Sequence, residues 1–210
     1  MTATAAARSA AVRHARRLNR YTIGWNVGEA VVAFGAALAA GSVSLVAFGL
    51  DSVIEVSAAM ILAWRLAQER RDDCMQGADR RATHAIALCF AALALYVSIQ
   101  AVRDLGGEAR PDASPVGIVL AALSLVVMPV LARAKANLAP VLGSRAQESE
   151  ANQTRLCALL SAVLLIGLLA NAALGWWWAD PVAALGIATI ALVEAQRTWR
   201  AESLEDTCCT

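Results

Sequence analysis

Six long apolar segments, separated by short polar connections, form the main pattern along the chain. Most of them hold about 20 residues, which is the length that an α-helix needs to cross the hydrocarbon core of a bilayer. The six segments lie at residues 21–40, 43–65, 83–102, 115–134, 154–174 and 181–196. The pattern therefore predicts an all-α polytopic membrane protein with six transmembrane helices.

Local signals add detail to this plan. Gly24 and Gly28 form a small-residue pair of the kind that lets a neighbouring membrane helix pack closely. Three consecutive tryptophans, 176–178, are typical of the aromatic belt at a membrane interface. Asp180 and Pro181 follow them, and this order predicts that the sixth helix begins with Asp180 as its N-cap.

Basic residues are concentrated at both ends of the chain and in every second connection. All but two of the 18 lysines and arginines fall there, including Lys135, which we place in the connection between the fourth and fifth spans. Only Arg103 and Arg110 fall on the other side. Because basic residues near span ends stay cytoplasmic, both termini are predicted to be cytoplasmic. Residues 1–20 then form a basic N-terminal segment, 21–197 the transmembrane domain and 198–210 a short tail.

The composition agrees with a membrane protein. Of the 210 residues, 59% are hydrophobic and only 17% are charged, which excludes an ordinary soluble domain. The net charge of +1 provides no field that would attract nucleic acid, so we expect no nucleic-acid partner. Five scattered cysteines argue against a secreted disulfide framework. The excess of arginine over lysine and the abundant alanine point to a bacterium, and so to a multi-pass protein of the bacterial inner membrane.

Carboxyl groups inside the predicted spans are the strongest functional signal, because ionisable groups at membrane depth are costly and are usually kept for function. Asp51 and Glu55 lie four residues apart on the second span and so share one helix face. Both cannot stay charged there without a cation, which suggests divalent metal binding in exchange for protons. Alternatively, the pair faces a water-filled vestibule or bonds to other helices. Asn26 and Glu29 on the first span line the same cavity or bond to another helix.

Two motifs flank this acid pair. Gly41-Ser42 forms a turn after the first span, before Asp51 and Glu55, and Ala179-Asp180-Pro181 opens the last span. In their order and spacing these motifs resemble the cation diffusion facilitator family over about residues 21–197. The resemblance implies six helices with both ends inside and a transporter of divalent metal cations. Because the sequence ends soon after the sixth span, it also implies a short member without the C-terminal cytoplasmic domain that helps to hold the homodimer.

The resemblance also implies a metal site. In the family, a histidine and an aspartate four residues apart on the fifth helix complete a tetrahedral site with the second helix. The matching positions here are Gln153 and Cys157. The implied ligands are Asp51, Glu55, Gln153 and Cys157, and their three oxygens and one sulfur suit zinc or cadmium better than magnesium or calcium.

Several alternatives stay open for the fifth span. A different register would use Glu150 or Asn152 as the ligand. Taken by itself, Cys157 is typical of a small apolar packing residue. It also lies near the cytoplasmic start of its predicted span, whereas Asp51 lies well inside its own span. An extension of the fifth helix toward Glu148 would bring the two side chains to a common depth.

The sequence therefore predicts a secondary transporter that exports zinc-like divalent cations from the cytoplasm in exchange for protons. The expected partners are divalent metal cations, protons, the lipid bilayer and a second copy of the chain, with no resident cofactor. The changed residues Gln153 and Cys157 motivate an alternative, a non-transporting metal sensor or partner subunit of the same fold. We expect no enzyme, because H-E-x-x-H, G-x-S-x-G and glycine-rich phosphate motifs are absent. The role of the Cys208-Cys209 pair in the tail is open.

Overall fold

Six α-helices make up the computed structural model, which describes residues 2–68, 76–107, 110–142 and 145–203. The helices are α1 (Thr2–Ala40), α2 (Val43–Gln68), α3 (Gln76–Leu105), α4 (Pro115–Leu142), α5 (Arg145–Leu174) and α6 (Ala179–Ser203). All six are long and apolar enough to cross a membrane. The prediction of an all-α protein with six transmembrane helices is confirmed.

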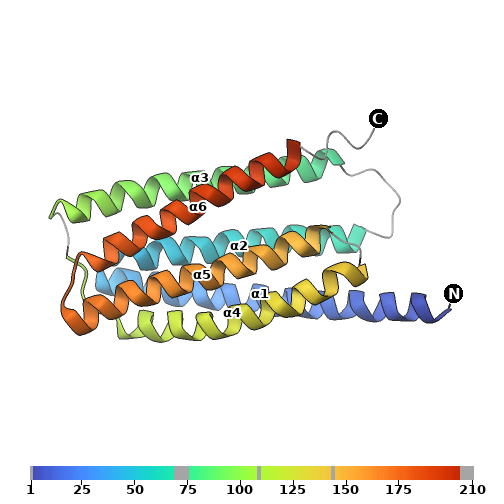
Figure 1. Cartoon of the computed structure of the whole chain (residues 1–210), viewed down its shortest axis with the longest axis horizontal. Coiled ribbons are helices and arrows are strands. Elements are labelled where there is room, and N and C mark those ends of the chain that lie inside the picture. Colours follow the sequence, from blue (N-terminus) through green and yellow to red (C-terminus); the bar gives the residue numbers. More distant parts are fainter. Residues whose placement is uncertain (1, 69–75, 108–109, 143–144, 204–210) are drawn as a thin grey trace.

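The helices run along a common axis and form one bundle (Figure 1). The most extensive pairings join α4 to α5, α3 to α6 and α1 to α2. Helix α2 also contacts α3, α5 and α6, so it occupies the centre of the bundle. Because the number of crossings is even, the start of α1 and the end of α6 lie at the same end of the molecule (Figure 1).

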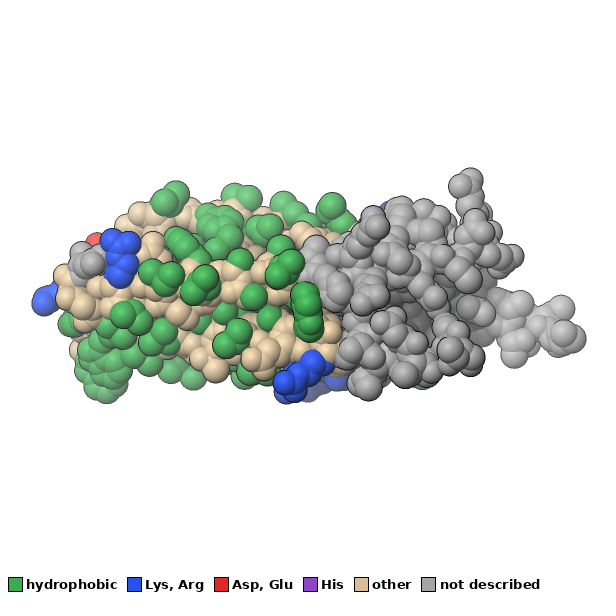
Figure 2. All heavy atoms as spheres, turned by 90° about the horizontal axis from the view of Figure 1, so that it is seen from above, with side chains coloured by type: hydrophobic (Ala, Val, Ile, Leu, Met, Phe, Trp, Pro, Cys, Tyr) green, Lys and Arg blue, Asp and Glu red, His purple; other side chains and the backbone are tan. Residues whose placement is uncertain are grey.

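Apolar side chains cover the outside of the bundle. Figure 2 shows hydrophobic side chains spread over the described part of one face, with basic side chains near its edges. Large exposed residues include Val31, Leu38, Val126 and Ile166. A soluble monomer rarely exposes so large an apolar surface, whereas the lipid chains of a bilayer would cover it. The protein is therefore a multi-pass membrane protein.

Several helices extend beyond the predicted spans. Helix α1 begins at Thr2, α4 continues to Leu142 and α5 already begins at Arg145. Hydropathy marks only the residues that suit the hydrocarbon core, whereas a helix continues for as long as its residues find packing partners. Ala11 and Ala15 of α1, for example, are buried together with Leu142 of α4.

This extension changes the position of Lys135. The prediction that Lys135 lies in a cytoplasmic connection is wrong, because α4 continues past it and its side chain is fully buried. Its ammonium group is therefore part of the interior of the bundle. Without Lys135, the basic residues are still concentrated in the segments that are predicted to be cytoplasmic. The predicted orientation of the termini depends on that uneven distribution.

The turn between α1 and α2 is built from Gly41 and Ser42. Gly41 has a φ of 64°, a left-handed conformation that glycine adopts at low cost. The Ser42 N–H then donates to the Ala37 carbonyl at 3.2 Å, which closes the end of α1. The Ser42 hydroxyl accepts from the Leu45 N–H at 3.2 Å and so caps the start of α2.

Asp180 ties this turn to α6. The prediction that Asp180 is the N-cap of its own helix is wrong, because α6 begins at Ala179 and Asp180 lies buried within the first turn. Its carboxylate accepts a hydrogen bond from the Ser42 hydroxyl at 2.6 Å. It also accepts from the Ser44 hydroxyl and, at 3.4 Å, from the Ser44 N–H. Asp180 therefore stabilises the start of α2 and holds it against α6.

Close helix contacts occur at a different glycine from the predicted pair. Gly24 and Gly28 are exposed on α1, and no described atom of another helix lies within 4 Å of the position that a Cβ would take at either. At Gly167 of α5, in contrast, an added Cβ would lie 2.5 Å from the Cβ of Ala183. Gly167 therefore permits a close approach of α5 and α6.

Candidate metal site

Three of the four predicted ligands meet in the interior of the bundle. Asp51 and Glu55 of α2 are 4% and 1% exposed, and Cys157 of α5 is 1% exposed. The Cys157 thiol lies beside both carboxyl groups. The start of α5 at Arg145 supplies the extension that the sequence required for the two helices to meet at one depth.

The fourth predicted ligand, Gln153, lies one turn before Cys157 and is half-buried. Its neighbour Thr154 is fully buried, and the Thr154 hydroxyl donates to Glu55 Oε1 at 2.9 Å. Asn152, an alternative from the sequence, is exposed and accepts a hydrogen bond from Arg155 at 3.0 Å. Gln153 as a metal ligand stays a prediction.

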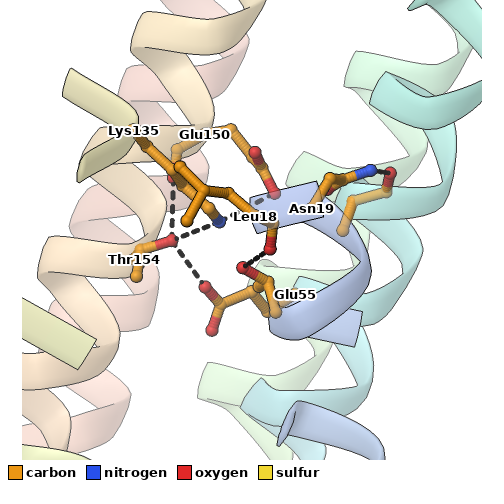
Figure 3. Close-up of polar contacts among 8 residues, drawn as sticks. Leu18, Asn19, Glu55, Lys135, Glu150 and Thr154 are labelled. Atoms are coloured by element: carbon orange, nitrogen blue, oxygen red, sulfur yellow. Dashed lines mark hydrogen bonds and ion pairs between the residues drawn. The ribbon is translucent and has the colours of Figure 1, made fainter. Parts of the chain in front are cut away.

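A polar network extends from Glu55 to α4 (Figure 3). The Lys135 ammonium group donates to Glu150 Oε1 at 3.0 Å and to the Thr154 hydroxyl oxygen at 2.9 Å. The single Thr154 proton has two acceptors in reach, Glu55 Oε1 at 2.9 Å and the Glu150 carbonyl oxygen at 3.0 Å. The network therefore connects a buried ion pair between α4 and α5 to one carboxyl group of the acid pair on α2.

Sequence reasoning missed Lys135 and Thr154 as parts of this site. Lys135 is the only lysine of the chain, and it lies between apolar residues of α4. The available signal was a single lysine, among many arginines, in an apolar stretch. A cation that is buried in such a stretch requires a carboxylate partner. Glu150 supplies that partner, and the sequence had named it only as an alternative ligand.

In this conformation the described side chains around Asp51 and Glu55 do not form a complete coordination shell for a metal ion. Among the residues that the structure describes, no three His, Cys, Asp or Glu side chains are arranged closely enough to hold a metal ion together. Glu55 is instead held by Thr154. Glu55 Oε2 makes no hydrogen bond with a described residue and is available to a cation, whereas coordination through Oε1 would require Glu55 to give up its bond from Thr154.

A six-helix membrane bundle with two acidic groups and a thiol enclosed between its helices has the features of a protein that handles cations inside the membrane. The family model of the cation efflux transmembrane domain matches residues 20–204. The chain therefore belongs to the cation efflux family, the cation diffusion facilitators that the sequence resembles. No curated protein matches the chain. Membership supports cation efflux as the activity. The Cys208-Cys209 pair lies outside the described residues.

Proposed function

We propose that the protein exports a divalent cation of the zinc class in exchange for protons, with Asp51 and Glu55 as the groups that alternate between metal and protons. The observation that carries this proposal is the charge balance inside the bundle. Lys135 and Glu150 form an ion pair at 3.0 Å, which is neutral as a unit. Asp51 and Glu55 make no ion pair of their own among the described residues. One divalent cation or two protons would balance them.

The choice of the zinc class rests on Cys157. Its sulfur lies beside the two carboxyl groups, and a thiolate is a ligand that zinc and cadmium accept readily. Magnesium and calcium prefer oxygen ligands alone. The sulfur therefore favours the softer cations as cargo.

Thr154 supports an exchange of metal and protons, because Glu55 can leave its hydrogen bond with Thr154 at a low cost in free energy. The Thr154 hydroxyl can redirect its hydrogen bond from Glu55 Oε1 to the Glu150 carbonyl oxygen, which lies at nearly the same distance. The hydroxyl oxygen keeps its bond from Lys135 throughout. When Glu55 turns to the metal, no buried donor of Thr154 loses its acceptor, so Glu55 can alternate between Thr154 and the cargo.

The direction of transport depends on orientation. The start of α1 and the end of α6 share one end of the bundle, and the basic residues support a cytoplasmic location for that end. The cargo would then enter from the cytoplasm and leave on the opposite side of a bacterial cell membrane after a movement of the helices.

Purified protein in liposomes tests this function. A zinc-sensitive dye and a pH-sensitive dye are placed inside, and zinc is added outside. We expect zinc uptake accompanied by movement of protons in the opposite direction, and no uptake of magnesium. Tight zinc binding without any flux would instead support the sensor or partner-subunit alternative and would contradict the transport proposal.

Replacing Thr154 tests its role in holding Glu55 without metal. In Thr154→Val, the ionisable Glu55 carboxyl group loses the hydrogen bond that the Thr154 hydroxyl donates to Oε1. When Oε1 takes part in coordinating the metal, this bond, worth about 1.5–3 kcal/mol, stabilises only the metal-free form. We therefore expect zinc to bind about tenfold more tightly or better and to be released more slowly. Thr154→Ser keeps the hydroxyl and serves as the matched control. Weaker zinc binding by Thr154→Val, measured by calorimetry, would contradict this role.

Replacing Cys157 tests the choice of metal. Cys157→Ser removes the sulfur from the predicted ligands, so zinc and cadmium should lose about tenfold or more in affinity while manganese changes little. Zinc should also slow alkylation of Cys157 in protein whose other four cysteines are serine. Cys89→Ser, at an exposed position of α3, is the control. An unchanged metal preference together with unchanged alkylation would make Cys157 a packing residue.

A further inference from the structure

A second polar cluster lies where α1 meets α2 and α4. It consists of Glu29 of α1, Ser52 of α2 and Ser124 of α4, and Asn26 lies three residues before Glu29 on the same face of α1. Each of these side chains is at most 2% exposed. The Ser52 hydroxyl donates to Glu29 Oε2 at 2.9 Å, and Ser124 and the Trp25 indole lie beside the same carboxyl group. The cluster is therefore a buried, oxygen-rich site built around one carboxyl group.

Most polar atoms of this cluster lack a partner. Glu29 Oε1, Asn26 Oδ1 and Nδ2, Ser124 Oγ and the Trp25 indole N–H are buried without a hydrogen bond of good geometry to any described residue. Buried polar atoms are almost always satisfied, and each exception needs an explanation. A proton on Glu29 would satisfy few of these atoms. A metal cation would be coordinated by several of the oxygens at once.

We propose that Asn26, Glu29, Ser52 and Ser124 form a second cation site, which takes a monovalent alkali cation, sodium or potassium. The available donors are one carboxylate, one amide oxygen and two hydroxyl oxygens, and such all-oxygen sets suit hard cations. Only one negative charge is present, so a monovalent ion leaves the buried site neutral. A divalent ion would leave an uncompensated charge in a region of low dielectric constant.

The second site is separate from the acid pair but electrostatically linked to it. Glu29 interacts electrostatically with both Asp51 and Glu55, and Ser52 follows Asp51 directly on α2. Positive ions at the two sites would repel each other, so occupancy of one site weakens binding at the other. This link rests on the proposed function, because it requires the divalent cargo to bind at Asp51 and Glu55.

Equilibrium binding of radioactive sodium and of rubidium, as a potassium analogue, to the purified full-length chain tests the site directly. The measurement uses choline chloride to hold ionic strength constant. We expect saturable binding of one ion per chain, weakened about tenfold or more in Glu29→Gln and also weakened in the milder Ser124→Ala. Asp51→Asn should keep it. The site would be refuted if neither ion binds above the choline background, or if Asp51→Asn abolishes binding while Glu29→Gln retains it.

A linkage measurement separates this inference from the proposed function. In the wild type, sodium or potassium should weaken zinc binding, and zinc should weaken alkali-ion binding by the same factor. In Glu29→Gln, zinc should still bind but no longer respond to the alkali ion. Alkali-ion binding without any zinc binding or flux would refute the transport proposal and leave the second site standing. Zinc binding that responds equally to the alkali ion in wild type and Glu29→Gln would refute the link.

Discussion

Asp51→Asn is expected to reduce zinc flux in liposomes by about 100-fold or more, the largest functional effect among the variants considered. The change preserves the size of the side chain and removes only the charge that a divalent cation must meet. Insertion into the membrane should not suffer, because a neutral amide is less costly at membrane depth than a carboxylate. The measurement compares initial zinc uptake at equal amounts of protein in the liposomes.

Two further variants define what this result means. Glu55→Gln should cause a similar loss, since the two acids share the charge of the cargo. Asp112→Asn changes an exposed acid in the connection between α3 and α4, and it should transport zinc normally. Near-normal flux in Asp51→Asn would show that the acid pair is structural and that the cargo binds elsewhere.

Lys135→Met is expected to destabilise the protein by about 3–5 kcal/mol, the largest effect on stability. Methionine is similar in length but removes the ammonium group, so Glu150 becomes an unpaired buried acid and Thr154 loses a donor. Both groups lie in the interior, where water cannot replace the missing partner. Unfolding by heat or by SDS in mixed micelles measures the change in the free energy of unfolding.

The matched control removes both charges. Lys135→Met combined with Glu150→Gln should recover most of the lost stability, because no uncompensated charge is then left inside the bundle. Arg133→Met, two residues earlier on α4 at an exposed position, should remain close to the wild type. Wild-type stability of the single Lys135→Met variant would mean that the ion pair contributes nothing to the fold.

The six helices were predictable because crossing a bilayer imposes a strong constraint on each segment by itself. About 20 apolar residues are needed, and that requirement can be read without knowing any neighbour. The ends of the helices were less predictable. Helix α1 continues back to Thr2 and α5 to Arg145, because contacts with other helices rather than hydropathy decide where a helix outside the hydrocarbon core ends.

Asp180 illustrates why local motifs can suggest the wrong partner. An aspartate before proline is a good signal for an N-cap, and the sixth helix does begin next to it. Its carboxylate nevertheless bonds to Ser42 and Ser44, more than 130 residues earlier in the chain. The first turns of α2 and α6 meet in space, and a hydrogen bond depends on distance in space rather than on distance in sequence.

The sequence by itself determined the class of protein, the number of membrane helices and the acid pair, because length, hydropathy and the spacing of Asp51 and Glu55 are properties of single segments. Only the tertiary structure decided which groups surround that pair. It placed Cys157 beside the two acids, turned Thr154 toward Glu55 and buried Lys135 against Glu150. These contacts join different helices, and the rotation and depth of each helix follow from packing against its neighbours.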